Sequence, residues 1–239
     1  IYDILNQNKV NKIIKTKSST LEEIRLTSYL EMKKIKVVDT NIGDFICSVF
    51  TERPYSFKSS AAHKNTEQIA DIYTNQFGVK ENLNAKQLTI YTKNILRKEV
   101  YNPEALITGA NFLISNTGSI VFTENEGNIL KSTSFAPIHI IVAGIDKMIT
   151  SIDELSVLLP LSSLYDNNKN ISSLYSIINS PSSNEDKVQN LYLILLNNNR
   201  TNILSKEKQR NILSCIQCGA CLEVCPIYNV IGGHTYKEY

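Results

Sequence analysis

The sequence has no excess of charge of either sign and no long apolar run. Its 25 lysines and arginines and 23 aspartates and glutamates leave a formal net charge of +2, so the chain lacks the basic field that nucleic-acid binding requires. No stretch approaches the roughly 18 consecutive apolar residues of a membrane-spanning helix. The hydrophobic fraction of 42% is enough for a globular core. We therefore expect no nucleic-acid partner and no transmembrane segment.

Two common sequence signals are also missing. No G-x-G-x-x-G fingerprint is present, so we expect no flavin or nicotinamide site of the dinucleotide-binding type in this chain. The first residues do not have the pattern of a secretory signal peptide. The chain begins with Ile1 and not with methionine, and we expect the protein to extend beyond this end.

Cysteine is scarce except in one short stretch near the C-terminus. Four of the five cysteines have the spacing C-x2-C-x2-C-x3-C-P, which is the bacterial ferredoxin run for cubane iron–sulfur clusters. Cys215, Cys218 and Cys221 are predicted to hold one 4Fe-4S cluster. Gly219 allows the backbone to turn tightly between them. Cys225, which precedes a proline, is predicted to ligate a second 4Fe-4S cluster.

Other uses of the cysteines fit the spacing less well. A zinc site completed by His234 is one alternative, but structural zinc sites usually bring two well-separated C-x2-C pairs or paired histidines. A disulfide framework conflicts with an odd number of cysteines and with the missing signal peptide. Cys47 lies in the apolar run 45–50 and is predicted to be buried. The first cluster then lacks a fourth ligand here, so we expect a further cysteine run beyond Tyr239.

Alternating strand and helix patterns predict an α/β fold with a parallel sheet. The first unit is a strand at 10–14, a helix opened by a capping box of Thr20 and Glu23, and a strand at 36–39. Further helices are predicted at 42–51, at 66–77 with Thr66 as its cap, at 85–100, and at 153–159 before Pro160. Further strands are predicted at 105–115, 119–123, 138–143, 174–178 and 191–196. A tight turn at 116–118 joins the first two of these as a hairpin, and Ser205 is predicted to cap a helix that leads to Cys215.

Three loops contain candidate site residues. Lys17 and Ser18 follow the first strand, where parallel sheets bind ligands, and they suit a phosphate or carboxylate, although a solvated turn is the alternative. His63 and Lys64 precede a helix and form a second anion candidate, while a hydrogen-bonded packing role is the alternative for the histidine. Glu126 lies in a polar loop that holds a reactive carboxylate or is an ordinary turn.

Glycines supply another candidate feature. Gly109 and Gly118 lack side chains, so backbone donors beside them are able to approach an oxyanion closely.

Several motifs follow one another in an order that resembles one family. They are residues 108–111, 117–119, 125–128, His139, residues 142–147, the cysteine run and residues 232–234. This order resembles the iron–sulfur lactate-utilisation protein B family, whose N-terminal part is the lactate-utilisation (LUD) domain. The resemblance covers residues 15–239. At position 146 this sequence has Asp146 where the family pattern has glutamate.

The resemblance implies a three-layered α/β domain with a parallel or mixed sheet, of the ribose-phosphate isomerase/CoA-transferase-like type. A small helical ferredoxin-type iron–sulfur segment is expected to follow it. Residues 1–200 would be the LUD domain without its N-terminal start. Residues 201–239 would begin a 4Fe-4S ferredoxin-type domain that continues past Tyr239.

The resemblance also implies partners and ligands. It implies two 4Fe-4S clusters in the full-length protein, a cytoplasmic location, and other lactate-utilisation subunits that together oxidise L-lactate to pyruvate. Lactate or a related 2-hydroxy acid is the implied small-molecule ligand. Asn111, Thr117 and His139 lie in the shared motifs and join Lys17, Ser18, His63, Lys64, Gly109 and Gly118 as substrate or anion-binding candidates.

Three functions are compatible with these features. The first is an electron-transfer subunit of a lactate-oxidising system, because cubane clusters pass single electrons. The second is a group-transfer or isomerase-type enzyme that uses Glu126, although such an enzyme does not need the cysteine run. The third is an assembly subunit whose clusters are structural.

Overall fold

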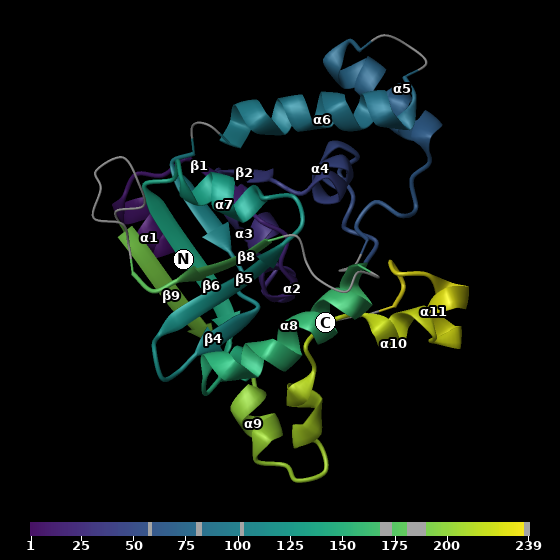
Figure 1. Cartoon of the computed structure of the whole chain (residues 1–239). Coiled ribbons are helices and arrows are strands. Elements are labelled where there is room, and N and C mark those ends of the chain that lie inside the picture. The colour runs from purple at the N-terminus through teal and green to yellow at the C-terminus, as the bar shows by residue number, and fades with distance from the viewer. Residues whose placement is uncertain (57–58, 80–82, 101–102, 168–173, 181–189, 237–239) are drawn as a thin grey trace.

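Two sheets contain the strands of the computed structural model, which describes residues 1–56, 59–79, 83–100, 103–167, 174–180 and 190–236 (Figure 1). The first sheet has five strands in the order β2-β1-β3-β6-β9, and all neighbours pair in parallel. These strands are β1 (Lys12–Lys15), β2 (Lys36–Asp39), β3 (Ala105–Thr108), β6 (Ile138–Gly144) and β9 (Asn190–Leu196). The prediction of an α/β fold with a parallel sheet is confirmed.

The second sheet has four strands in the order β7-β4-β5-β8. β4 (Phe112–Ile114) and β5 (Ser119–Glu124) form the predicted antiparallel hairpin. β8 (Leu174–Ile178) is antiparallel to β5, and β7 (Met148–Ile149) is parallel to β4. The single strand predicted at 105–115 is wrong, because residues 109–111 carry the chain from the first sheet to the second.

The sequence of β6 explains why the two sheets pack together. Successive side chains of a strand point to opposite faces, and every residue of β6 is buried. Ile138, Ile140 and Val142 contact the helices on one side of the first sheet, whereas Ile141 and Ala143 contact the second sheet. A strand that is apolar at nearly every position is therefore covered on both faces. The buried partners of Ile141 and Ala143 in the second sheet are Leu113, Ile120 and Phe122.

Three short helices cover the other face of the first sheet. They are α1 (Tyr2–Gln7), α2 (Ser19–Glu23) and α3 (Leu26–Met32), and their leucines join the same core cluster as Ile13 and Ile107. The single helix predicted from Thr20 is divided, because Arg25 has a left-handed conformation with φ of 51°. Ser18 stands at the N-cap and Thr20 lies inside α2, so the predicted capping box is wrong.

A helical arm lies between β2 and β3 in the sequence and has a core of its own. It consists of α4 (Ile42–Val49), α5 (Thr66–Phe77) and α6 (Ala85–Val100), and α5 and α6 lie away from the sheets in Figure 1. Tyr73 is fully buried in this arm, and its hydroxyl lies 2.8 Å from Thr92 Oγ1. The predicted helices are confirmed, but Asn65 caps α5 in place of Thr66, through a capping box with Gln68.

The outer face of the second sheet is covered by α8 (Leu155–Asn167), which follows the 3-10 turn η2 (Ile152–Glu154). Leu155 packs there against Phe112, Ile114 and Val121. The helix continues through Pro160, where the sequence predicted its end. The layers are therefore α1–α3, first sheet, second sheet and α8. This corrects the expected three-layered arrangement, because the hairpin forms a second sheet whose far face needs its own helix.

Short helical pieces follow β9. They are α9 (Arg200–Leu204), η3 (Arg210–Ser214), α10 (Ala220–Glu223) and α11 (Pro226–Ile231). Ser205 ends α9 and begins no helix, so that prediction is wrong. Over 201–236 no ferredoxin-type segment is evident, so the expected 4Fe-4S domain remains a prediction. None of the helices in the described ranges has the length and apolar character that crossing a bilayer requires.

Candidate functional site

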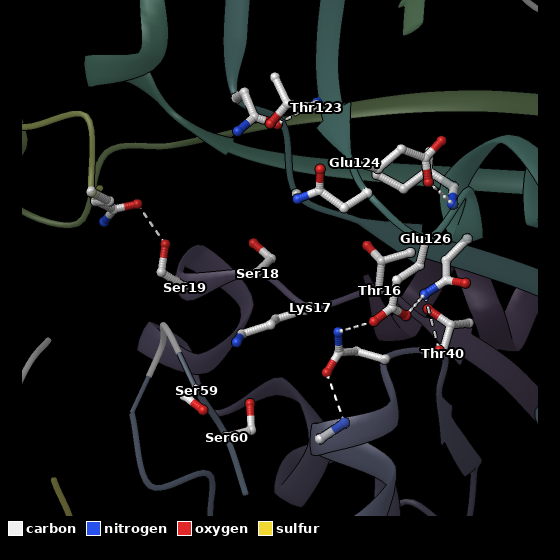
Figure 2. Close-up of a pocket in the computed structure, with 18 of the residues that line it drawn as sticks. Thr16, Lys17, Ser18, Ser19, Thr40, Ser59, Ser60, Thr123, Glu124 and Glu126 are labelled. Carbon is white, nitrogen blue, oxygen red and sulfur yellow. Dashed lines mark hydrogen bonds between the residues drawn. The ribbon is translucent and has the colours of Figure 1, made fainter. Parts of the chain in front are cut away.

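A cavity of about 660 Å³ lies at the carboxyl edge of the first sheet (Figure 2). Parallel strands end at the same edge, and β2 and β3 lie on opposite sides of β1. Such a switch in strand order opens a crevice at the carboxyl ends of the strands. β1, β2, β3 and β6 all deliver residues to this cavity from the segments that follow them.

The loop that follows β1 forms one wall of the cavity, and a buried ion-pair network lies next to it. Lys15 is the last residue of β1, and its ammonium lies 2.5 Å from Glu22 Oε1 and 3.0 Å from Asp39 Oδ1. Burial acts to lower the pKa of Lys15, but Asp39 and Glu22 outweigh it, so the pKa is raised and the lysine stays charged. The network joins β1, β2 and α2 beneath Lys17 and Ser18, which line the cavity.

Gly109 brings the end of β3 close to the end of β1. A Cβ atom at Gly109 would lie 2.8 Å from Ser18 Cβ and closer still to the Ser18 hydroxyl. The missing side chain of Gly109 is therefore needed for packing against Ser18. Asn111 follows, and its Oδ1 accepts a hydrogen bond from Thr123 N at 2.9 Å, which holds the end of β5 beside the cavity.

Two glutamates lie on the wall that follows β5. Glu124 is buried, and its carboxylate accepts hydrogen bonds from the backbone of Ile129 at 2.6 Å and Leu130 at 3.0 Å, at the start of α7 (Asn128–Thr133). Glu126 is exposed, and Asn128 donates to it at 2.7 Å. Figure 2 shows Glu124 and Glu126 across the cavity from Ser18. Glu124 thus anchors α7, while Glu126 is accessible to a ligand.

The cysteine segment forms another wall of this cavity. Ile216, Gln217 and Cys218 line it, and the hydroxyl of Ser19 donates a hydrogen bond to Gln217 Oε1. Gln217 and Gly219 have φ angles of 60° and 75°, so the chain turns sharply on both sides of Cys218. The spacing of the cysteines predicted that they are cluster ligands, but nothing in the sequence indicated that this segment borders the cavity.

The cysteine thiols have the chemistry of cluster ligands. All four are free, and all are exposed or partly exposed. The backbone N–H of Tyr228 is the main cause that lowers the pKa of the Cys225 thiol, which favours the thiolate. Cys47 differs, because it is buried as predicted and burial raises the pKa of its thiol to about 11. These four thiols are a donor set that fits iron–sulfur clusters.

His63 and Lys64 lie beside the C-terminal segment and do not line the cavity. His63 Nε2 is 2.7 Å and Lys64 Nζ is 2.6 Å from the Glu52 carboxylate. One ligand atom from each of Glu52, His63 and His234 lies within 4.8 Å of the others. The Lys64 ammonium already neutralises Glu52, so we interpret the group as a salt-bridge cluster. His234 therefore belongs to this cluster, and within the described ranges no contact joins it to a cysteine.

The remaining candidates are also outside the cavity lining. His139 on β6 is fully buried, lies 2.8 Å from Thr108 Oγ1 through Nε2, and stacks on Phe122 at 6.0 Å. Burial lowers the pKa of His139 to about 4. Thr117 bonds Ser119 in the turn between β4 and β5.

The structure thus separates the candidate residues into two groups. Those that line the cavity are Lys17, Ser18, Gly109, Asn111, Glu126 and Cys218. Those that do not are His63, Lys64, Thr117, Gly118 and His139, together with Cys215, Cys221 and Cys225.

Lys147 is a cavity residue that sequence reasoning missed. It ends the 3-10 turn η1 (Ile145–Lys147), which follows β6, and only 8% of the residue is exposed. The available signal was its place just after a strand that is apolar on both faces.

The sequence was compared with protein families, with curated proteins and with solved structures. The family model described as LUD domain matches residues 1–200. "Lactate utilization protein B" of Geobacillus sp. (strain WCH70) is 34% identical over 239 residues, and that of Bacillus subtilis (strain 168) is 33% identical over 239 residues. Each match covers 99% of this chain and 50% of the relative, so the chain spans about half the length of these relatives. The crystal structure of a DUF162 family protein from Deinococcus radiodurans is 12% identical, with a TM-score of 0.33 over 81% of this chain and 92% of that chain.

Proposed function

The chain belongs to the LUD domain family, and on this premise we propose that it is an iron–sulfur electron-transfer subunit of a system that oxidises L-lactate to pyruvate. The observation that carries the proposal is that Cys218 and the two residues before it line the cavity. Relatives named lactate utilization protein B support a role in lactate utilisation. The proposal places the protein in the cytoplasm with other lactate-utilisation subunits.

The residues present fit the clusters that the proposal needs. Cys215, Cys218 and Cys221 would hold one 4Fe-4S cluster, and Cys225 would ligate a second. When bound, such clusters accept and donate single electrons. The hydrogen bond between Ser19 and Gln217 holds the cysteine segment against the cavity wall, so a ligand in the cavity lies beside Cys218.

The chain's own part in the reaction is binding and relay. Oxidation of lactate to pyruvate removes two electrons and two protons. No dinucleotide fingerprint is present in this sequence, so the group that takes the hydrogen from C2 is assigned to a partner subunit. The cavity of this chain would hold the acid, the hydroxyl proton would pass to solvent, and clusters held by the cysteine segment would carry the two electrons onward from the partner's group, one at a time.

The test is iron and acid-labile sulfide analysis with low-temperature EPR on the anaerobically purified full-length protein, before and after adding L-lactate with its partner subunits. We expect about eight irons per chain and a reduced-cluster signal that develops with lactate. Iron that does not respond to lactate would support the assembly role. Stoichiometric zinc without sulfide would refute the redox function.

A group-transfer enzyme is the second candidate, because the exposed carboxylate of Glu126 faces the cavity. Such chemistry requires an accessible, activated carboxylate as nucleophile. Glu126→Ala distinguishes the two functions. Electron transfer predicts that lactate-driven cluster reduction persists in this variant, whereas its loss with the clusters intact would favour direct chemistry by Glu126.

A further inference from the structure

Lys147 is a buried cation that pairs with no carboxylate among the described residues. The residue is 8% exposed and lines the cavity from the end of β6. Its ammonium forms no hydrogen bond and no ion pair with any residue in the part of the chain that the structure describes, although Asp146, Cys215 and Glu23 lie near enough to act on it electrostatically. Lys15, the other buried lysine of this sheet edge, has two carboxylate partners. The contrast shows that the fold pairs one lysine internally and leaves the other open to the cavity.

The acidic neighbours of Lys147 are engaged by Arg200. The Arg200 guanidinium donates to Glu23 Oε1 at 2.9 Å and Glu23 Oε2 at 2.8 Å, and its Nε donates to Asp146. A Cβ atom at Gly144 would collide with Asp146 Oδ1 and lie 2.8 Å from Arg200 Nε, so the glycine makes room for this contact. Arg200 therefore holds both carboxylates, and Lys147 is left without either.

An unpaired buried ammonium is energetically unfavourable, because the protein replaces little of the hydration that the charge loses. Burial accordingly lowers the pKa of Lys147. An anion that enters the cavity would supply the missing counter-charge and strengthen a charge-assisted hydrogen bond. Thr16 supports a polar occupant, since its buried hydroxyl lines the same cavity and has no partner among the described residues.

We propose that Lys147 binds the carboxylate of the 2-hydroxy acid in the cavity, an inference that rests on the proposed function. Cys218, in the cysteine segment near the C-terminus, lines the same cavity. The acid is thus held by a cation on the sheet edge and lies beside the cysteine segment. The chemical class is a small monocarboxylate, and its charged end is the part that Lys147 recognises.

The test measures the affinity of the anaerobically purified full-length protein for L-lactate and for 1,2-propanediol, which lacks the carboxylate, by isothermal titration calorimetry. We expect Lys147→Met to weaken L-lactate binding at least about tenfold and Lys147→Arg to recover part of it. Propanediol binding should not respond to either variant. Lys36→Met is the matched control, because Lys36 is an exposed lysine at the opposite end of β2, and we expect it to leave lactate affinity unchanged.

Two results would overturn the inference. One is unchanged lactate affinity in Lys147→Met, with circular dichroism showing that the variant is folded. The other is a shifted cluster potential in that variant without loss of lactate binding, which would make Lys147 a counter-ion for the cysteine segment. If lactate still reduces the clusters in either case, only this inference fails. If lactate neither binds nor reduces the clusters of the unmodified protein, the proposed function fails as well.

Discussion

The hydroxyl of Ser19 donates a hydrogen bond to Gln217 Oε1 across 198 positions of sequence. Ser19 begins α2, directly after the loop that follows β1, and Gln217 lies between the first two cysteines of the run. The contact fastens the cysteine segment to the cavity. The proposed transfer of electrons from a ligand in the cavity depends on this placement.

Removing this contact should loosen the cysteine segment. A single hydrogen bond contributes about 1 kcal/mol, so we expect backbone amides near Cys218 to exchange with solvent about fivefold faster in Ser19→Ala. Hydrogen exchange with mass spectrometry measures this rate. Ser48→Ala, which removes a hydroxyl from α4, is the control and should leave the segment unchanged. Equal exchange rates in the two variants would show that Ser19 does not hold the segment.

Gly109→Ala should destabilise the protein, because the new Cβ would overlap the side chain of Ser18. Overpacking of this kind typically costs about 1–3 kcal/mol, measured as the free energy of unfolding in urea. The double variant Gly109→Ala with Ser18→Gly removes the overlapping atoms and should recover part of the loss. A Gly109→Ala protein as stable as the unmodified chain would contradict the close packing of β1 and β3.

His139 should make stability depend on pH. Its pKa is lowered from 6.5 to about 4 by burial, so the unfolded chain binds a proton in this range that the folded chain does not. Stability is then complete above about pH 6.5 and falls as the pH drops toward 4, by up to about 1.4 kcal/mol per pH unit. Urea unfolding across this range measures the slope. His139→Gln should flatten it, and an unchanged slope would assign the dependence to other groups.

Arg200→Met should affect both stability and ligand binding. The variant leaves Glu23 and Asp146 without their cation, and breaking a buried pair costs about 3–5 kcal/mol. The freed Asp146 is the neighbour of Lys147 and becomes able to pair with it. We therefore expect weaker L-lactate affinity, although Arg200 does not line the cavity. Calorimetric titration of the folded variant tests this, and unchanged affinity would show that Arg200 does not keep Lys147 available.

Apolar runs and turn residues, which are local features of the sequence, made much of the fold predictable. The apolar run at 138–143 predicted the strand β6, and the tight turn at 116–118 predicted the hairpin of β4 and β5, in which Gly118 has a φ angle of 68°. The two-sheet arrangement was not predictable, because nothing local shows that residues 109–111 cross from one sheet to another. Capping errors at Thr20, Thr66 and Ser205 have a similar cause, since several adjacent polar residues are able to cap a helix and packing selects one of them.

By itself the sequence determined the cysteine run and its ligand spacing, because those ligands lie within a few residues of one another. It also determined the polar loop after β1, since ligand sites in parallel sheets follow strand ends. Only the tertiary structure decided that Cys218 borders the cavity, that His139 is enclosed between sheets, and that Lys147 forms no ion pair within the described part of the chain. Each of these depends on which segments distant in sequence pack together, and Arg200, far from Asp146 in the chain, decides the last.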